Sequence, residues 1–442
     1  MPRRTCFDTL SRPRIHVRTP RDARIAPVFP RPGVARWLSL EAITPPMRPN
    51  QRVQSLSLST TLALDARAKE LVAAGRDVVN MTVGEPDFDA PAAVQAAAIA
   101  AVQSGKVRYT AAEGTASLRK AIAAHVSATR KVEFSAQEIT VCHSAKHALS
   151  GACLALIEPG DEVLLLLPAW VSYEEIVRFA GGLPVSVPSR ADCGPDLDAI
   201  ARAITRKTRG ILINSPCNPS GYVLTPAEVR ALAALAEKHD LWIVSDEIYR
   251  RLIYEGEPDL SPASISPALR ARTVIVDGAS KTFAMTGYRI GFVAAPREIA
   301  AAVAKLHSQL TGSPNYVSQC AFEAALTSEP PEVARMCVEF DARRRHIVAG
   351  LTALGLETPW PRGAFYAFPR VTPWLDARGS AGFCEDLLEE QNLAVVPGSA
   401  FGVDEHVRFS YATSMPKIEQ ALARLAAFLA TRSKAAARAA RR

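Results

Sequence analysis

The segment DGASKTFAMTGYRIG, residues 277–291, decides the fold of this chain. It follows the apolar run Thr273–Val276, which predicts a buried strand because short β-branched runs bounded by glycine favour that state. A lysine that leaves such a strand among apolar neighbours can lose its proton and act as an amine nucleophile. Lys281 is that lysine, and Arg289 offers a planar guanidinium suited to a phosphate. A surface Lys and Arg beside a strand would look the same, so the rest of the chain has to supply the other contacts of a site.

Ser280-Lys281, followed by the residues Met285 to Gly291, resembles the lysine signature of the class I aminotransferases, which are pyridoxal-phosphate enzymes of fold type I. The resemblance covers about residues 51–430 and is greatest to the prokaryotic aspartate/prephenate branch. It implies an α/β fold, with a large domain built on a mainly parallel seven-stranded sheet flanked by helices and a smaller α+β domain. A P-loop is excluded because that motif needs glycines where Ile275 and Ser280 stand.

Composition and charge place the chain among ordinary globular proteins. Of its 442 residues 48% are hydrophobic and 22% are charged, and no apolar run approaches the roughly 20 residues that cross a bilayer. The net charge of +8 is concentrated at the two ends, because the first 50 residues carry +7 and the last 12 carry +5, which leaves about −4 for the body. Neither a membrane-spanning role nor nucleic-acid binding by the body is expected.

The first 50 residues are rich in Arg and Pro and lack hydrophobic periodicity, so they are expected to form a disordered basic extension. Residues 51–95 are expected to form an N-terminal arm and part of the small domain. The large cofactor-binding domain is predicted over 96–310, the small C-terminal domain over 311–430 and a basic tail over 431–442. An organelle transit peptide is disfavoured because the nine prolines of the extension oppose an amphipathic helix.

The eight cysteines are scattered and form no CxxC pair, which favours reduced thiols and a cytoplasmic protein. Cys142, His143 and His147 lie close together in the sequence and could suggest a metal site. No carboxylate or second cysteine joins them locally, so no metal is expected.

The strand predicted over Leu241–Ser245 ends at Asp246, where a buried carboxylate needs a cation. The resemblance implies that this cation is the protonated ring nitrogen of pyridoxal 5'-phosphate. It also implies that Asn218, in an Asn-Pro-Ser-Gly turn, and Tyr249 contact the phenolic oxygen of the cofactor. Trp170 could fill core space or stack on the cofactor ring; the resemblance implies the stacking role, although Ala169 stands where the family usually has Tyr.

A predicted strand over Ile139–Cys142 is followed by small residues that open a helix, which makes Ser144 and Ala145 candidates for a phosphate cradle. The family commonly has Gly at the position of Ser144 and Gln at the position of His147. The resemblance adds Ser280 and Arg289 to the phosphate contacts. It also implies that Tyr109 reaches the phosphate of a neighbouring subunit, and therefore that the protein is a homodimer with shared active sites.

The resemblance also implies the substrate contacts, with Gly84 over the substrate carboxylate and Arg408 holding the α-carboxylate. Substrate contacts are further implied for Trp170 and Asn218. One branch of the family binds the distal carboxylate with an arginine of the partner subunit, but Ser308 stands at that place here. Another branch uses a lysine at the position of Lys146, which is our hypothesis for a dicarboxylate. Ser59 and Thr61 are weaker candidates, and a solvated Lys146 is the alternative.

The implied function is a pyridoxal-phosphate-dependent aminotransferase that moves an amino group between an L-amino acid, aspartate or glutamate first, and a 2-oxo acid. Lys281 would carry the cofactor and its freed amine would move the substrate proton, with Asp246 and Tyr249 as the other catalytic residues. Three alternatives stay open: an aromatic or kynurenine aminotransferase, a C–S lyase of the same fold, and a transcription regulator with an aminotransferase-like domain. The regulator would need an N-terminal helix-turn-helix, which the Pro-rich extension does not provide.

Overall fold

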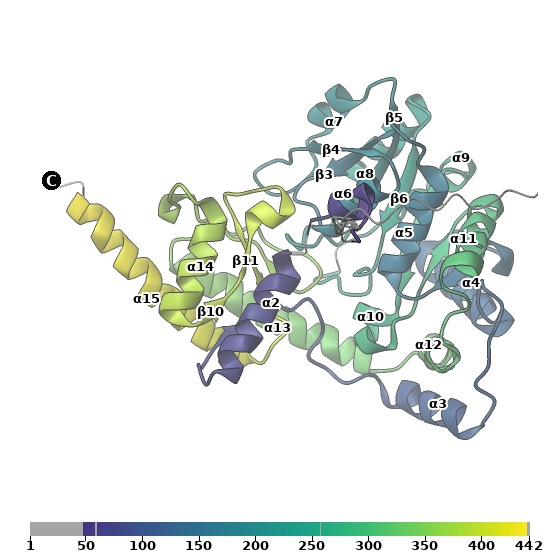
Figure 1. The fold of residues 1–442 in the computed structure, drawn as a ribbon, viewed down its shortest axis with the longest axis horizontal. Helices are drawn as coiled ribbons and strands as arrows, with labels where there is room; N and C mark the ends of the chain where they lie inside the picture. Colours follow the sequence, from purple (N-terminus) through teal and green to yellow (C-terminus); the bar gives the residue numbers. More distant parts are fainter. Residues whose placement is uncertain (1–46, 58–59, 257, 440–442) are drawn as a thin grey trace, which may run out of the picture. The chain divides into compact units, whose positions relative to one another are not determined.

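The computed structural model describes residues 47–57, 60–256 and 258–439, and the elements below belong to one unit, Asn50–Arg442. A seven-stranded sheet organises its larger part, with strand order β2-β8-β7-β6-β5-β3-β4 (Figure 1). β8 is antiparallel to both neighbours and all other pairs are parallel, which confirms the predicted α/β fold class. The strands are β2 (Ile139–Cys142), β3 (Glu162–Leu166), β4 (Leu183–Val187), β5 (Thr208–Asn214), β6 (Trp242–Asp246), β7 (Thr273–Gly278) and β8 (Gly291–Ala294).

Helices cover both faces of this sheet, because successive side chains of a strand point to opposite faces and both sets are apolar here. Val244 and Val274 pack with α5 (Ala145–Leu156), α6 (Ser172–Phe179) and α11 (Arg297–Leu310). Ile243 packs with the helices of the opposite face, which are α7 (Leu197–Ala203), α8 (Pro226–Lys238) and α9 (Pro267–Arg270). A third core joins Ile275 and Phe292 to α3 (Ala92–Gln103), α4 (Ala116–Arg130) and α12 (Tyr316–Ser328).

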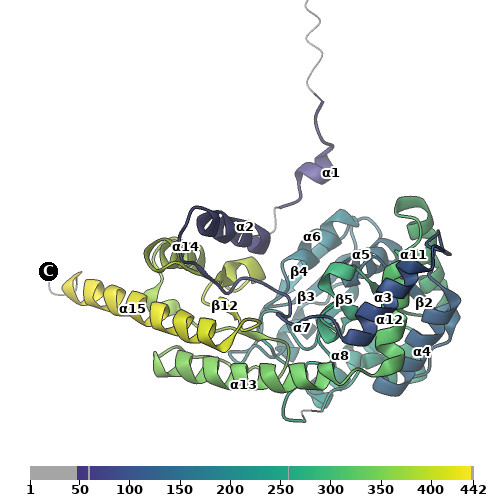
Figure 2. The ribbon, with the colours of Figure 1, turned by 90° about the horizontal axis from the view of Figure 1, so that it is seen from below.

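The smaller part combines short strands with long helices from both ends of the chain. β1 (Val79–Asn80) pairs in parallel with β10 (Leu393–Ala394), and β11 (Val396–Pro397), β12 (Val407–Ser410) and β9 (Tyr366–Ala367) form an antiparallel sheet. The helices of this part are α2 (Thr60–Ala73), α13 (Glu332–Ala353), α14 (Gly379–Gln391) and α15 (Met415–Ala439). Two four-residue helices complete the set: α1 (Gln51–Gln54) precedes α2 in the chain, and α10 (Ala279–Thr282) follows β7 in the larger part. α13 and α15 lie side by side (Figure 2).

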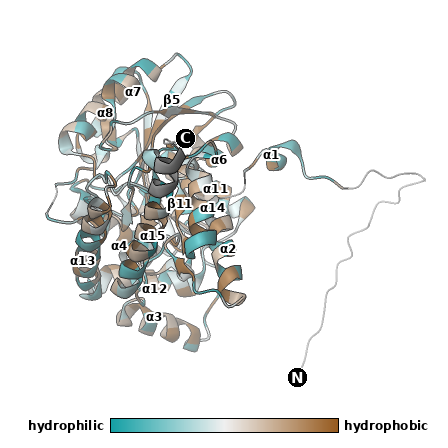
Figure 3. Ribbon diagram, turned by 90° about the vertical axis from the view of Figure 1, so that its left-hand side faces the viewer, coloured by the Kyte–Doolittle hydropathy of each residue, from teal (hydrophilic) through white to brown (hydrophobic). Residues whose placement is uncertain are grey.

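α13 shows how an amphipathic pattern anchors this part. Hydrophilic and hydrophobic residues alternate along its turns (Figure 3), because only one side of the helix is buried. The buried side includes Phe340, Ile347 and Leu351, which join the core of β9, β12, α14 and α15.

Most predicted elements appear within a residue or two of their expected ends. Three differ. The segment Val78–Val83 predicts a strand, but only β1 forms, because the backbone leaves the β10 ladder to form the loop before Gly84. The segment Gly363–Phe368 also predicts a strand, of which only β9 forms. β4 and the antiparallel β8 were not expected.

The predicted domain boundaries stay predictions. α12 shares its core with α3 and α4, and α15 runs continuously through residue 430. Of the extension expected over residues 1–50, residues 1–46 lie outside the described residues. No helix within the described ranges is long and apolar enough to cross a membrane.

Candidate active site

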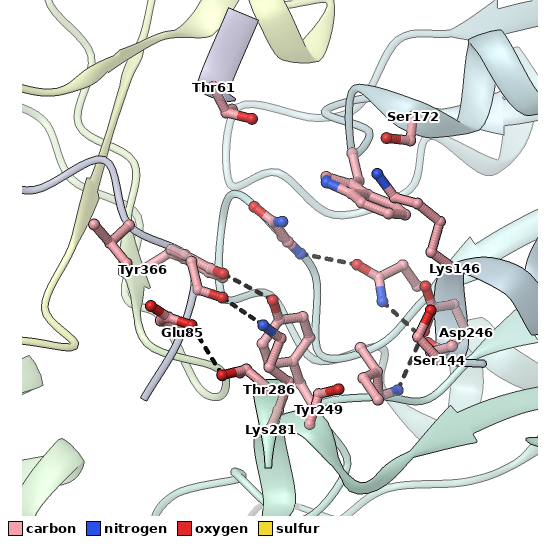
Figure 4. A pocket seen from close by; sticks show the side chains of 18 of the residues that line it. Thr61, Glu85, Ser144, Lys146, Ser172, Asp246, Tyr249, Lys281, Thr286 and Tyr366 are labelled. Atoms are coloured by element: carbon pink, nitrogen blue, oxygen red, sulfur yellow. Dashed lines mark hydrogen bonds between the residues drawn. The ribbon is translucent and has the colours of Figure 1, made fainter. Parts of the chain in front are cut away.

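A cavity of about 460 Å³ opens at the carboxyl ends of the parallel strands, where ligands bind in open α/β sheets. It is closed on its other side by residues of β9, β12 and α2. Every predicted site residue except Tyr109 lines it: Gly84, Ser144, Ala145, Lys146, Trp170, Asn218, Asp246, Tyr249, Ser280, Lys281, Arg289 and Arg408. Figure 4 shows ten labelled lining residues, with Thr61, Lys146 and Ser172 on one side and Lys281, Thr286 and Tyr249 on the other. We call Asn218, Asp246, Tyr249 and Arg408, which are all buried, the floor, and Thr61, Lys146 and Ser172 the rim.

Asp246 ends β6 and is 5% exposed. It accepts hydrogen bonds from the Tyr173 hydroxyl (2.7 Å) and the Ile248 N–H (3.2 Å), but it forms no ion pair with any residue in the described part of the chain. Burial raises its pKa to about 6, although the bond from Tyr173 opposes the shift. A carboxylate in this position is suited to a cationic ligand atom.

Arg408 lies on β12 and is 2% exposed. It donates to the side-chain oxygen of Asn218 (2.9 Å) and to the Thr82 carbonyl (2.6 Å), whereas its buried Nε has no hydrogen-bond partner. The rings of Tyr366 and Phe401 lie 4.6 and 5.1 Å from its guanidinium carbon. No carboxylate of the described residues pairs with it, and burial lowers its pKa. This buried cation is suited to an anionic ligand group.

A chain of amides joins these two residues. The Asn218 backbone N–H donates to the side-chain oxygen of Asn214 (2.9 Å), and the Asn214 amide donates to the carbonyl of Asp246 (3.0 Å). Asn218 therefore holds a fixed position between Asp246 and Arg408, since its own oxygen accepts from Arg408. Tyr249 completes the floor, and its hydroxyl shares a 2.7 Å hydrogen bond with that of Tyr366.

Lys281 lies on the short helix α10 that follows β7, and its amine donates a hydrogen bond to the Gly84 carbonyl. Burial lowers the pKa of Lys281 to about 8, against the opposing effect of Glu85. The Gly84–Glu85 loop is fixed from the other side, because the Thr286 hydroxyl donates to the Glu85 carboxylate (2.9 Å). A Cβ at residue 84 would lie 3.0 Å from the hydroxyl of Tyr366, so glycine leaves this backbone bare toward the cavity.

Ser144 is the N-cap of α5, and its φ of 119° lies in the region that favours glycine. The departure from the family's glycine is thus accommodated with strained backbone at a cavity wall. Its hydroxyl accepts from the His147 N–H (3.4 Å), and the first N–H groups of α5 lie at the cavity. Arg289 also lines the cavity and is exposed, with one N–H on the Thr286 carbonyl (2.8 Å). These groups, with Ser280, form a wall that is suited to an anion.

Lys146 is exposed at the rim, with its amine 4.8 Å from the centre of the Trp170 ring. Burial of its stem and the charge of Arg289 lower the pKa of Lys146. Thr61 lines the same side, whereas Ser59 lies outside the described residues. Ser308 is an exposed residue of α11 away from the cavity lining.

Tyr109 does not line the cavity and is 98% exposed. The N–H of the next residue, Thr110, donates to the Ser313 hydroxyl (3.1 Å), which holds this segment beside the loop after α11. Its predicted role in a neighbouring subunit stays a prediction.

His147 stacks on His307 of α11, with ring centres 4.2 Å apart, and meets the ring of His143 edge-on. Its Nδ1 accepts from the His143 backbone N–H (3.3 Å). In the described part of the chain, no group of three or more His, Cys, Asp or Glu side chains is arranged to hold a metal ion. The seven described cysteines are free thiols.

Four side chains that line the cavity were missed: Tyr173, Tyr366 and Asn214, which are hydrogen-bonded to predicted site residues, and Glu85. Tyr173 follows Trp170 by three residues at the start of a helix, and that helical spacing is the one signal that could have placed it near the site. The others come from segments that the sequence brings together only through the fold.

Comparisons with known proteins agree with this geometry. Residues 76–425 match the family aminotransferase class I and II. The chain is 43% identical over 387 residues to the aspartate/prephenate aminotransferase of Thermus thermophilus, which covers 86% of this chain and 98% of that protein. It is 40% identical over 392 residues to the aspartate aminotransferase of Bacillus subtilis, with 87% and 99% covered. The solved structure of the Thermus thermophilus aspartate aminotransferase with maleate superposes with a TM-score of 0.83 at 42% identity, covering 86% of this chain and 99% of that one.

Proposed function

Because this chain belongs to the class I and II aminotransferase family, we propose that it is a pyridoxal-phosphate-dependent aminotransferase acting on an acidic L-amino acid and a 2-oxo acid. One observation carries the proposal: a single cavity holds a lysine amine with a lowered pKa together with a buried carboxylate and a buried guanidinium, neither of which has an oppositely charged partner among the described residues. The amine would bind an aldehyde, the carboxylate a ring cation and the guanidinium a substrate carboxylate.

The residues present fit pyridoxal phosphate. Asp246, which has no cation partner in the described ranges, would pair with the ring nitrogen, and Asn218 and Tyr249 would contact the phenolic oxygen. Ser144, Ala145, Ser280 and Arg289 would hold the phosphate at the start of α5, and Trp170 would cover the ring. When bound, the group supplies an electron-withdrawing ring that stabilises negative charge at the substrate Cα.

Lys281 is proposed to bind the cofactor and then to carry the proton from the substrate Cα. With a pKa of about 8, about one amine in ten is neutral at pH 7, which is the form that attacks a carbonyl or accepts a proton. The Gly84 carbonyl holds the amine in place from the opposite wall. Asp246 keeps the end of the cavity that would hold the ring nitrogen negative, and Tyr249 presents a hydroxyl that is hydrogen-bonded to the hydroxyl of Tyr366.

We infer that the substrate is a dicarboxylate. Arg408 is proposed to bind the α-carboxylate, since its two N–H groups on Asn218 and Thr82 fix the plane of the guanidinium. Lys146 at the rim is proposed to bind the distal carboxylate of aspartate or glutamate. Support comes from the solved structure of the Thermus thermophilus relative with maleate, which is itself a dicarboxylate.

We also propose that the protein is a homodimer with shared sites and works in the cytoplasm. The exposed Tyr109 lies on a segment tied to the loop after α11, next to Leu310, which is 64% exposed. A second copy that covered these side chains would bring Tyr109 toward a neighbouring cavity. The cytoplasmic location rests on the absence of paired cysteines in the sequence.

A transamination screen tests the substrate class. Aspartate, glutamate, phenylalanine, tyrosine and kynurenine would be offered as donors with 2-oxoglutarate, oxaloacetate or prephenate as acceptors. We expect aspartate with 2-oxoglutarate to react fastest. Faster turnover of the aromatic donors would favour an aromatic or kynurenine aminotransferase, and release of ammonia and a 2-oxo acid from cystathionine would identify a C–S lyase.

A further inference from the structure

The guanidinium of Arg130, the last residue of α4, is buried at the ends of β6 and β7, and the side chain has no exposed surface. Its Nε donates to Glu247 (3.0 Å), one terminal nitrogen donates to Asp277, and the other donates to the hydroxyl of Thr129 (2.7 Å). One cation thus joins two buried carboxylates, which are 3% and 6% exposed.

These two carboxylates flank Asp246. Glu247 follows it in the chain, and Asp277 lies on β7, one residue beyond Val276, which is in register with Asp246. Glu247 has a second cation, Arg250 (3.1 Å), whereas Arg130 is the one cation that the described residues offer to Asp277.

At these strand ends the buried carboxylates outnumber the cations by one. Arg130 and Arg250 provide two positive charges against Asp246, Glu247 and Asp277, and Arg250 also pairs with Asp259 on the outer side (2.7 Å). Both Asp277 and Glu247 act on Asp246 by repulsion, in a setting where water cannot screen it. Burial alone would lower the pKa of Arg130, but Asp277 and Glu247 raise it, so Arg130 stays charged.

We propose that Arg130 is a positioning residue for the cofactor: by neutralising Asp277 and Glu247 it leaves Asp246 as the single unmatched carboxylate that binds the ring cation. The inference rests on the proposed function, because the ring cation belongs to pyridoxal phosphate. Arg130 itself does not line the cavity and acts only through the charge that surrounds Asp246.

Other ionisable groups also face Asp246, and they are unchanged in the variants below. They come from four elements or loops: Tyr173 of α6, Cys217 after β5, Tyr249 after β6 and Lys281 of α10. None of them is hydrogen-bonded to Arg130, so a change at Arg130 or Asp277 reaches the cofactor through charge rather than through a rearranged contact.

The test follows the visible absorbance of the lysine-bound cofactor as the pH is varied. Asp277→Asn keeps the size of the side chain and an oxygen for Arg130 but removes a negative charge, so we expect the midpoint of the titration to fall by on the order of 1 pH unit. Arg130→Met removes a positive charge and should raise the midpoint. The double variant removes both charges and should return it to near the wild-type value.

Asp240→Asn is the matched control, because Asp240 is exposed at the opposite end of β6 and pairs with Arg272 (3.0 Å). Its midpoint should stay within about 0.2 unit of wild type, since solvent screens the charge. Shifts of Asp277→Asn and Arg130→Met in the same direction, or no shift in Asp277→Asn, would overturn the proposal.

The design also covers a folding failure. If Arg130→Met does not fold, Asp277→Asn and the double variant decide, because neither leaves a buried charge on Asp277. Failure of the proposed function looks different: wild-type protein would then develop no visible band that depends on Lys281.

Discussion

The floor and the rim of the cavity each hold a cation that the sequence predicts to bind a substrate carboxylate, but the two lie in opposite environments. Arg408 is 2% exposed and is held by Asn218 and the Thr82 carbonyl, on a strand of the small sheet. Lys146 is exposed at the start of α5, and its amine lies over the ring of Trp170.

This difference in burial predicts that the floor is required for the reaction and that the rim affects only the preference for one substrate over another. A buried, oriented guanidinium gains strongly from an anion, because it has already lost its water. An exposed ammonium on a flexible stem gains little, because solvent and salt screen it. Substitutions in the floor should therefore cost far more than substitutions at the rim.

The largest effect is expected at Lys281. Lys281→Ala removes the amine that binds the cofactor and moves the proton, so turnover should fall by at least about 10⁴-fold. Single-turnover absorbance with aspartate would measure it. Lys305→Ala, an exposed lysine of α11, is the control and should keep wild-type activity. Activity near wild type in Lys281→Ala would contradict the assignment of the cavity as a pyridoxal-phosphate site.

Arg408→Lys should have the next largest effect. It keeps the charge but loses the fixed fork that contacts Asn218 and Thr82, so KM for every amino acid should rise about 10- to 100-fold. Steady-state kinetics with aspartate and with an aromatic donor would show the rise for both. Arg370→Lys, at an exposed ion pair, is the control. A rise in KM for aspartate alone would show that Arg408 does not bind the α-carboxylate, which every amino acid has.

The raised pKa of Asp246 in the floor predicts how the stability of the cofactor-free protein depends on pH. Asp246 has a folded-state pKa of about 6, above that of an unfolded aspartate, so the folded state binds the extra proton. The proton on Asp246 stabilises the folded state by on the order of 2–3 kcal/mol. This stabilisation is fully present below about pH 4 and is lost as the pH rises through 6. Urea unfolding at pH 4.5 and 7.5 would measure the difference between wild type and Asp246→Asn.

Asp246→Asn should lack that loss, whereas Asp240→Asn should retain it because Asp240 is exposed. Bound cofactor should also remove the loss from wild type, since a ring cation would favour the carboxylate. Identical pH profiles for wild type and Asp246→Asn would mean that the floor carboxylate is paired in a way that its contacts do not reveal.

The residues of the floor could be predicted from the sequence, whereas the side chains that hydrogen-bond to them could not, for a physical reason. Asp246 and Asn218 follow apolar strands, and a polar residue at that place is visible as an exception to the pattern. Tyr173 and Tyr366 have the sequence appearance of core aromatics, and their roles arise from hydrogen bonds to residues 73 and 117 positions away.

The fold shows the same division. The parallel strands other than β4 were predicted from apolar runs, whereas β8 was missed because its four residues continue directly from the lysine segment, with no turn signal to mark a new strand. The backbone of Ser144 could not be foreseen either, because a φ of 119° at a serine is imposed by the packing around it. A Cβ at Gly291, at the start of β8, would lie 2.4 Å from the Ala145 nitrogen, which shows how closely β8 approaches this turn.

The smallest effect is expected at the rim, and it separates the two regions most sharply. Lys146→Met keeps the length of the stem and its contact with Trp170 but removes the charge, so kcat/KM for aspartate should fall about 3- to 10-fold while an aromatic donor is unaffected. The loss should shrink at 0.5 M salt, because an exposed pair is screened. Lys120→Met, an exposed lysine of α4 outside the cavity, is the control. Equal losses for both donors would show that Lys146 supports the cavity wall through Trp170 and that the distal carboxylate is bound elsewhere.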